Sequence, residues 1–135
     1  MKLLVLTAEP ISAEVLREAA GDEAANAEVM VVSPALTESP LHFWVSDADE
    51  AIAHAQETAE ETVERLDAEG IDAAGDTGES DPMQALEDAL VTYEADRIVV
   101  FTHPDDERDY LEDGFVEEAE RRLGLPVIHR EVTRR

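Results

Sequence analysis

Three short runs of apolar residues constrain the fold of this chain more than any other feature. They are Leu3–Leu6, Val29–Val32 and Ile98–Phe101, and each is preceded by a charged residue and followed by a hydroxyl residue. Apolar runs of this length without polar alternation are typical of strands that are covered on both faces, as in parallel sheets. The strands predicted from these runs are Lys2–Thr7, Glu28–Pro34 and Arg97–Phe101.

Segments with helix signals separate the predicted strands. Ser12 is a suitable N-cap for the first of these helices, and Gly21 is a typical stop signal after it. The first two predicted helices are Ala13–Ala20 and Ala48 to about Glu69. The third begins at Asp81-Pro82, and its buried face carries Met83, Leu86, Leu90 and Tyr93. The last carries Val116, Ala119 and Leu123 on its apolar face and ends at Gly124.

The long predicted helix carries an apolar stripe at helical spacing. Its members are Ile52, Ala55, Ala59, Val63 and Leu66. Asp47 and Glu50 form a start that resembles a capping box. His54 lies near the stripe, and we expect it to be a partly buried, hydrogen-bonded residue and not a ligand. The preceding aromatic pair, Phe43-Trp44, is expected to pack on the core, the alternative being a clamp for a ligand ring.

Two weaker strands complete the pattern. Ile71–Gly78 alternates small and acidic residues, which is typical of a sheet edge, and Pro126–Val132 closes the chain. Strands and helices therefore alternate along the whole sequence. With right-handed crossovers this order predicts an α/β fold: a three-layer α/β/α sandwich with a five-stranded parallel sheet in the order 3-2-1-4-5, Rossmann-like in type. Residues 1–135 are expected to form a single domain.

The composition excludes several classes of function. The chain has 34 acidic and 10 basic residues, a net charge of −24, and a field of this sign repels nucleic acids and anionic membrane surfaces. There are no cysteines, which excludes disulfides and thiolate catalysis. No apolar run approaches ~18 residues and no leader pattern is present, so we expect a cytoplasmic protein. Adaptation to a salt-rich host, or compositional bias, is the favoured explanation of the acidity.

The second half of the chain carries a family resemblance. Gly78-Glu79-Ser80-Asp81-Pro82 precedes a helix, Ala95–Val100 leads into the fourth strand and a loop, and the last helix runs into Leu125–Ile128. In this order of elements the chain resembles the universal stress protein family over essentially its whole length. The resemblance implies an adenine nucleotide alpha hydrolase-like fold, a role in stress response, and a dimer through the last strand. It also implies membership of one of two branches, of which one binds ATP and the other does not.

The loop after the fourth strand departs from the ATP-binding branch. Members of that branch resemble one another in a Gly, two residues, Gly, nine residues, Gly and then Ser or Thr, and this spacing falls on Phe101, Pro104, Gly114 and Phe115. Glycines allow the backbone to approach phosphate closely and present N–H groups to it, and proline has no N–H. Ala8 also stands where the family usually has an aspartate. We therefore predict no ATP cofactor bound in the manner of the family.

The same loop is strongly acidic. Its acids are Asp105, Asp106, Glu107, Asp109, Glu112 and Asp113. Two like charges 4 Å apart repel by ~1 kcal/mol in water and ~4 kcal/mol near a protein surface. Several uncompensated carboxylates would therefore oppose the binding of a triphosphate.

Polar residues at the carboxyl ends of three predicted strands form the candidate ligand site. Thr7, Ser33, Thr102 and His103 lie at or next to these ends, and Gly114 follows in the loop. In open α/β sheets, ligands bind outside the carboxyl ends of the strands, so these groups are expected to face a small polar ligand. The favoured alternative is that the hydroxyls bond to nearby loop backbones.

His103 is the most reactive of these residues in principle. It could act as a base, or hold a metal together with Asp105 and Asp106, but His-Pro-Asp-Asp alone supplies too few ligands in fixed geometry. No nucleophile elbow, zinc-protease motif or Walker motif is present, so no residue is predicted to be catalytic and no metal is predicted.

Three hypotheses of function follow. The first is a non-catalytic, dimeric stress-protein-like module with a degenerate nucleotide site, which acts through a small ligand or a protein partner. The second is a protein that binds ATP or AMP through a rearranged loop, with Arg108 and a divalent cation supplying positive charge. The third is a small enzyme centred on His103.

The expected homodimer would form through the last strand. Val127, Ile128 and Val132 lie near a sheet edge and could pair with a second copy, whereas the neighbouring His129-Arg130-Glu131 could equally prevent that pairing.

Overall fold

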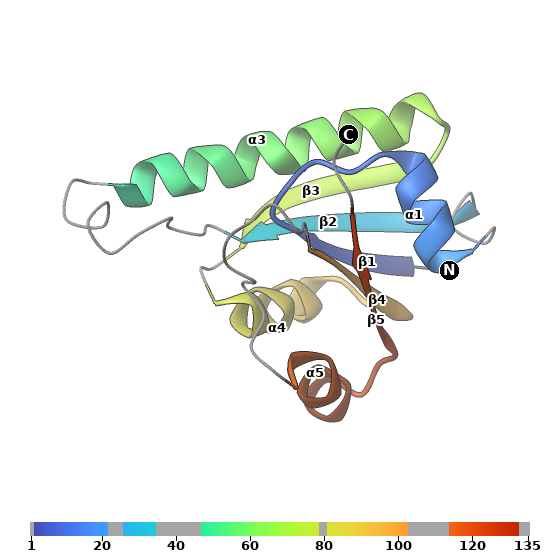
Figure 1. Cartoon of the computed structure of the whole chain (residues 1–135), viewed down its shortest axis with the longest axis vertical. Helices are drawn as coiled ribbons and strands as arrows, with labels where there is room; N and C mark the ends of the chain where they lie inside the picture. The colour runs from blue at the N-terminus through green and yellow to red at the C-terminus, as the bar shows by residue number, and fades with distance from the viewer. Residues whose placement is uncertain (1, 22–25, 35–46, 79–80, 103–113, 133–135) are drawn as a thin grey trace.

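The sheet and its covering helices are seen in a computed structural model of the chain (Figure 1). The structure describes residues 2–21, 26–34, 47–78, 81–102 and 114–132, and for residues 47–51 the backbone alone.

Five parallel strands form one sheet in the order β3-β2-β1-β4-β5. The strands are β1 (Lys2–Thr7), β2 (Glu28–Pro34), β3 (Asp72–Gly78), β4 (Arg97–Thr102) and β5 (Val127–Glu131). The predicted α/β class and the 3-2-1-4-5 order are confirmed. The three continuous apolar runs are the three central strands, whose neighbours on both sides and helices on both faces exclude water.

Helices cover both faces of the sheet. They are α1 (Ala13–Ala20), α3 (Asp47–Ala68), α4 (Pro82–Thr92) and α5 (Phe115–Leu123). Figure 1 shows α1 and α3 on one face and α4 and α5 on the other. Alternate residues of one strand serve the two faces: Leu3 and Val5 belong to the core under α1 and α3, and Leu4 and Leu6 to the core under α4 and α5. The predicted three-layer sandwich is therefore present.

The helix boundaries follow from local chemistry. Ser12 Oγ accepts a hydrogen bond from the Val15 N–H at 3.3 Å, and Gly21 follows α1 with a φ of 86°. Asp81 Oδ1 accepts from the Met83 N–H at 3.0 Å, with Pro82 in the first turn of α4. These contacts satisfy orphan N–H groups at the helix starts, as the sequence predicted.

The exposed face of α3 differs from the prediction. Ile52 is 48% exposed and His54 is exposed, whereas Thr58 and Thr62 are buried. Figure 1 shows the reason: the first turns of α3 extend beyond the carboxyl ends of β2 and β3, so no sheet lies beneath them. The prediction of a partly buried His54 is wrong. Thr62 Oγ1 instead receives the Ile11 N–H at 3.4 Å, which joins α3 to the segment before α1.

The remaining helices largely match their predicted faces. Met83 and Leu86 of α4 are buried, and Leu90 and Tyr93 are half-buried. The last strand is shorter than predicted, Val127–Glu131 instead of Pro126–Val132. The pair Phe43-Trp44 lies outside the described residues.

Candidate functional site

The carboxyl edge of the sheet brings Thr7 and Ser33 together. Ser33 Oγ donates a hydrogen bond to the Thr7 carbonyl at 2.8 Å, and both residues are buried. Thr7 Oγ1 in turn donates to the Glu9 carbonyl at 2.6 Å and accepts from the Glu9 N–H at 3.4 Å. Both hydroxyls therefore bond to backbone and fix the turn after β1, as the alternative interpretation of these residues predicted.

Thr102 has a different partner. Its Oγ1 lies 2.7 Å from His129 Nε2 of β5, and its carbonyl accepts from the Val132 N–H at 2.7 Å. These two contacts tie the end of β4 to the end of β5. No sequence motif indicates the Thr102–His129 pair, because the two residues meet only through the register in which Val100 pairs with His129 and Thr102 with Glu131.

Gly114 is the N-cap of α5 and has a φ of 81°, a conformation that favours glycine. Leaving aside Gly114 and its chain neighbours, no heavy atom of the described residues lies within 4 Å of a Cβ built at this position. The backbone at the start of α5 is thus approachable within the described part of the chain. Glu117 and Glu118 occupy the first turn of the helix and bring negative charge to this end.

Phe101 and Phe115 are core residues on opposite faces of the sheet. Phe101 is fully buried (0% exposed) among the residues under α1 and α3, and Phe115 (8% exposed) lies in the core under α4 and α5. These are the two positions where the spacing of the ATP-binding branch would place a glycine and a hydroxyl. Here both side chains serve apolar packing.

Several predicted features lie outside the described residues. They are His103, Pro104, the acids from Asp105 to Asp113, and Arg108. In the described part of the chain, no group of three His, Asp or Glu residues is arranged to hold a metal ion. Over the same residues, no helix combines the length and apolar character that a membrane span requires.

Among the described residues, Tyr93 has a perturbed pKa, and it lies at the opposite end of the sheet. The Tyr93 hydroxyl donates to the Glu28 carbonyl at 3.0 Å, and Lys2 Nζ lies 5.7 Å from the centre of its ring. Burial, followed by the charges of Glu28, Asp96 and Asp72, raises the pKa of Tyr93 to about 12. A protonated phenol at this position acts as a structural donor at neutral pH.

Comparisons with known proteins bear on the fold. No family model matches the sequence, and no curated protein matches it. Three solved structures are similar over nearly the whole chain, and all three belong to the universal stress protein family.

The structure from Burkholderia pseudomallei has a TM-score of 0.64 and 18% identity, covering 95% of this chain and 94% of its own. The structure from Archaeoglobus fulgidus has a TM-score of 0.61 and 22% identity, covering 96% and 93%. The structure from Arabidopsis thaliana, which has AMP bound, has a TM-score of 0.60 and 14% identity, covering 100% and 93%. Since all three superpose on at least 95% of this chain with TM-scores of 0.60 or more, the protein has the UspA-like fold of the universal stress protein family.

Proposed function

We propose that the protein is a non-catalytic, universal stress protein-like module whose nucleotide site is degenerate. It acts as a homodimer, through a small ligand or a protein partner. The observation that carries the proposal is the burial of Phe101 at the end of β4. A glycine there would open the backbone to phosphate, whereas the ring of Phe101 belongs to the core.

The hydroxyls at the carboxyl edge support the same conclusion. Thr7 and Ser33 bond to backbone carbonyls, and Thr102 contacts His129. A ligand that needed the Thr7 and Ser33 hydroxyls as donors would have to break contacts at the ends of β1 and β2. The hydroxyls at the carboxyl edge of the sheet therefore have structural partners, which is consistent with a binding module that carries out no reaction.

Charge also opposes a polyphosphate ligand. The net charge of −24 repels anions, and the first turn of α5 adds Glu117 and Glu118 beside the helix end that would face a phosphate. A positive helix end favours anions, but these two side chains offset that effect.

The proposed dimer forms through β5, which pairs with β4 on one side only within the described sheet. Val127 is buried and Ile128 half-buried, so an added strand from a second copy would extend an apolar layer. The cytoplasm is the proposed compartment.

Native mass spectrometry of freshly purified protein tests the proposal. We expect particles of two chains that carry no adenine nucleotide. Stoichiometric ATP retained by the protein would overturn the degenerate site, and a single-chain particle over the whole range of salt that the method tolerates would overturn the dimer.

A second candidate function is the binding of AMP through a rearranged loop. It is favoured by the AMP in the Arabidopsis neighbour and by the approachable backbone at Gly114. A monophosphate meets less repulsion than a triphosphate because it carries fewer charges. Titration with AMP while following the Gly114 amide resonance tests it: a saturable shift supports this candidate, and an unchanged resonance excludes it.

A further inference from the structure

The outer edge of β3 lies on the far side of the sheet from β5. Among the described residues, β3 pairs only with β2, and its residues Ala74, Gly75 and Asp76 are exposed. An edge strand presents unpaired N–H and C=O groups to which another extended segment can add. This edge is separate from the carboxyl-end site described above.

The hydrogen bonds of β3 show which of its N–H groups face outward. The Ala73 N–H donates to Asp67 Oδ1 at 3.4 Å, and the Thr77 N–H donates to Asp76 Oδ1 at 2.8 Å. Because backbone groups alternate between the two sides of a strand, Gly75 directs its N–H to the same outer side as these two residues. The acceptors at Ala73 and Thr77 are exposed side chains, which an incoming backbone carbonyl can replace.

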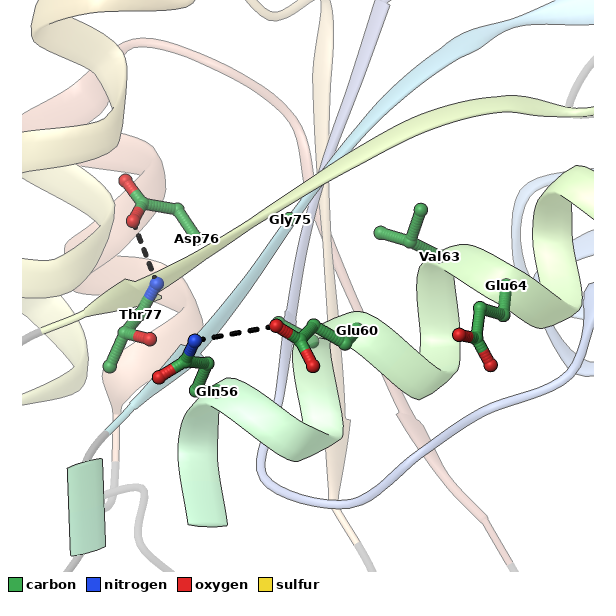
Figure 2. A pocket seen from close by; sticks show the side chains of 8 residues that line it. Gln56, Glu60, Val63, Glu64, Gly75, Asp76 and Thr77 are labelled. Atoms are coloured by element: carbon green, nitrogen blue, oxygen red, sulfur yellow. Dashed lines mark hydrogen bonds between the residues drawn. The ribbon is translucent and has the colours of Figure 1, made fainter. Parts of the chain in front are cut away.

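A groove of about 410 Å³ runs beside this edge, between β3 and α3. Gly75 makes the close approach of the two elements possible, since a Cβ on it would lie 3.1 Å from the Ala59 and Val63 side chains. Figure 2 shows Gln56, Glu60 and Glu64 along the α3 side of the groove, with Asp76 and Thr77 on β3.

The lining determines the chemistry of the partner. The charged residues that line the groove are Glu60, Glu64 and Asp76, and no Lys or Arg is among the lining residues. Figure 2 shows the Asp76 carboxylate on the side of β3 away from α3, so Glu60 and Glu64 supply the negative charge on the α3 side. Glu60 and Glu64 are one helical turn apart, about 6 Å along α3. Alternate residues of an extended strand are about 6.6 Å apart and point to the same face. A strand with a basic residue at every second position therefore matches the spacing of the two glutamates.

We propose that the β3 edge and the adjoining groove bind an extended, basic segment of a partner protein as a sixth strand. A second copy paired through this same edge is a poor occupant, because its own β3 carries Asp72 and Asp76 and no basic residue. The partner's backbone carbonyls take the N–H groups of Ala73, Gly75 and Thr77, and its cationic side chains lie against Glu60 and Glu64. The proposal is independent of whether the carboxyl edge of the sheet binds a nucleotide.

Titration of the full chain with three synthetic peptides tests the proposal, with the backbone amide resonances as the readout. The first peptide alternates arginine and threonine. The second replaces its threonines by proline, which keeps the charge but disfavours a regular added strand, because proline has a fixed φ and no N–H. The third replaces its arginines by glutamate. We expect only the first peptide to bind saturably, with shifted resonances and slowed hydrogen exchange at Gly75.

The double variant Glu60→Gln/Glu64→Gln should bind the first peptide about fivefold more weakly, as expected for two exposed ion pairs. Glutamine at position 60 keeps the contact with Gln56, which lies 3.3 Å away in the native protein. Glu57→Gln/Glu94→Gln is the matched control, because it changes the net charge equally at exposed positions outside the groove. Equal binding of the proline peptide, equal weakening in both variants, shifts confined to other elements, or no binding at all would overturn the proposal.

Discussion

Phe101 is the last apolar residue of β4, and the next residue, Thr102, already belongs to the carboxyl edge of the sheet. One position thus separates the core from the candidate site. The ring of Phe101 contributes to the core under α1 and α3, so the residue that would have to be small for a phosphate loop is large for packing. We therefore expect the bulk of this side chain to hinder the close approach of a phosphate to the backbone at the end of β4.

Phe101→Ala should destabilise the protein by about 3–5 kcal/mol, through lost apolar transfer energy and the cavity left behind. The free energy of unfolding in urea measures the effect. Val91→Ala is the control, because Val91 is 82% exposed and its truncation should change stability by less than about 0.5 kcal/mol. A Phe101→Ala effect as small as the control would mean that the ring does not support the core.

Tyr93 gives the protein a pH dependence in the alkaline range. Its pKa is raised from an ordinary value of 10.0 to about 12, chiefly by burial, so the folded protein holds this proton more tightly than the unfolded chain does. The resulting stabilisation is complete below about pH 10 and is lost as the pH rises through about 12.

Tyr93→Phe should reduce the alkaline loss of stability and should cost about 0.5–1.5 kcal/mol at neutral pH, where the bond to the Glu28 carbonyl is lost. Urea unfolding of both proteins between neutral pH and about pH 12 measures both effects. The same decline in stability in both proteins above pH 10 would contradict the role given to Tyr93.

At the scale of elements, the strands were more predictable than the faces of the helices. The strands β1, β2 and β4 can be recognised in the sequence as continuous apolar runs, because a strand buried on both faces tolerates few polar residues. The stripe on α3 predicted burial for Ile52, but periodicity does not show where the supporting sheet ends. The burial of Thr58 and Thr62 is not predictable from the sequence, because a hydroxyl residue on a helix can be exposed or buried and its type does not indicate which element will cover it.

The sequence predicts where the residues of the candidate site lie along the sheet, but not which hydrogen-bond partners they have. Thr7 and Ser33 were placed correctly at the carboxyl ends of their strands, since strand boundaries can be read from the sequence. Their partners depend on how strands distant in sequence are registered: Ser33 bonds to the carbonyl of Thr7, and Thr102 meets His129 across β4 and β5. A single sequence does not contain that register.

The contact between β3 and α4 gives a prediction at this scale. A Cβ on Gly78 would lie 2.7 Å from the Ala85 Cβ and 2.9 Å from Val32 Cγ1, so Gly78→Ala should destabilise the protein by about 1–3 kcal/mol through overpacking. At Gly75 the nearest atoms would be 3.1 Å away, so Gly75→Ala should cost less. Thermal unfolding ranks the two variants, and a reversed order would show that β3 packs differently.

At the scale of the whole molecule, the excess of acidic residues is the feature that most affects stability. The net charge is −24, and the ion pairs seen, such as Arg65–Glu61 at 2.9 Å and Arg122–Glu87 at 2.6 Å, are exposed or half-exposed. Pairs of this kind each contribute about 0–1 kcal/mol, which does not offset the repulsion among the remaining acids. Stability should therefore depend on screening by salt.

The midpoint of thermal unfolding should rise as potassium chloride is increased from about 0.1 M to about 1 M, because the Debye length falls from ~10 Å to ~3 Å. Chloride is preferred to sulfate, since sulfate also strengthens apolar burial. A midpoint that falls with chloride would show that attractive ion pairs outweigh the repulsion of the acidic surface.

The central proposal is that this protein with a UspA-like fold does not bind a nucleoside triphosphate, because the large core residue Phe101 stands at the end of β4 where a phosphate-binding loop would need a small residue. Calorimetric titration of the concentrated protein with ATP and Mg²⁺ tests it most directly. The account predicts no saturable heat. A stoichiometric isotherm that the Gly114 amide resonance follows in parallel would contradict it.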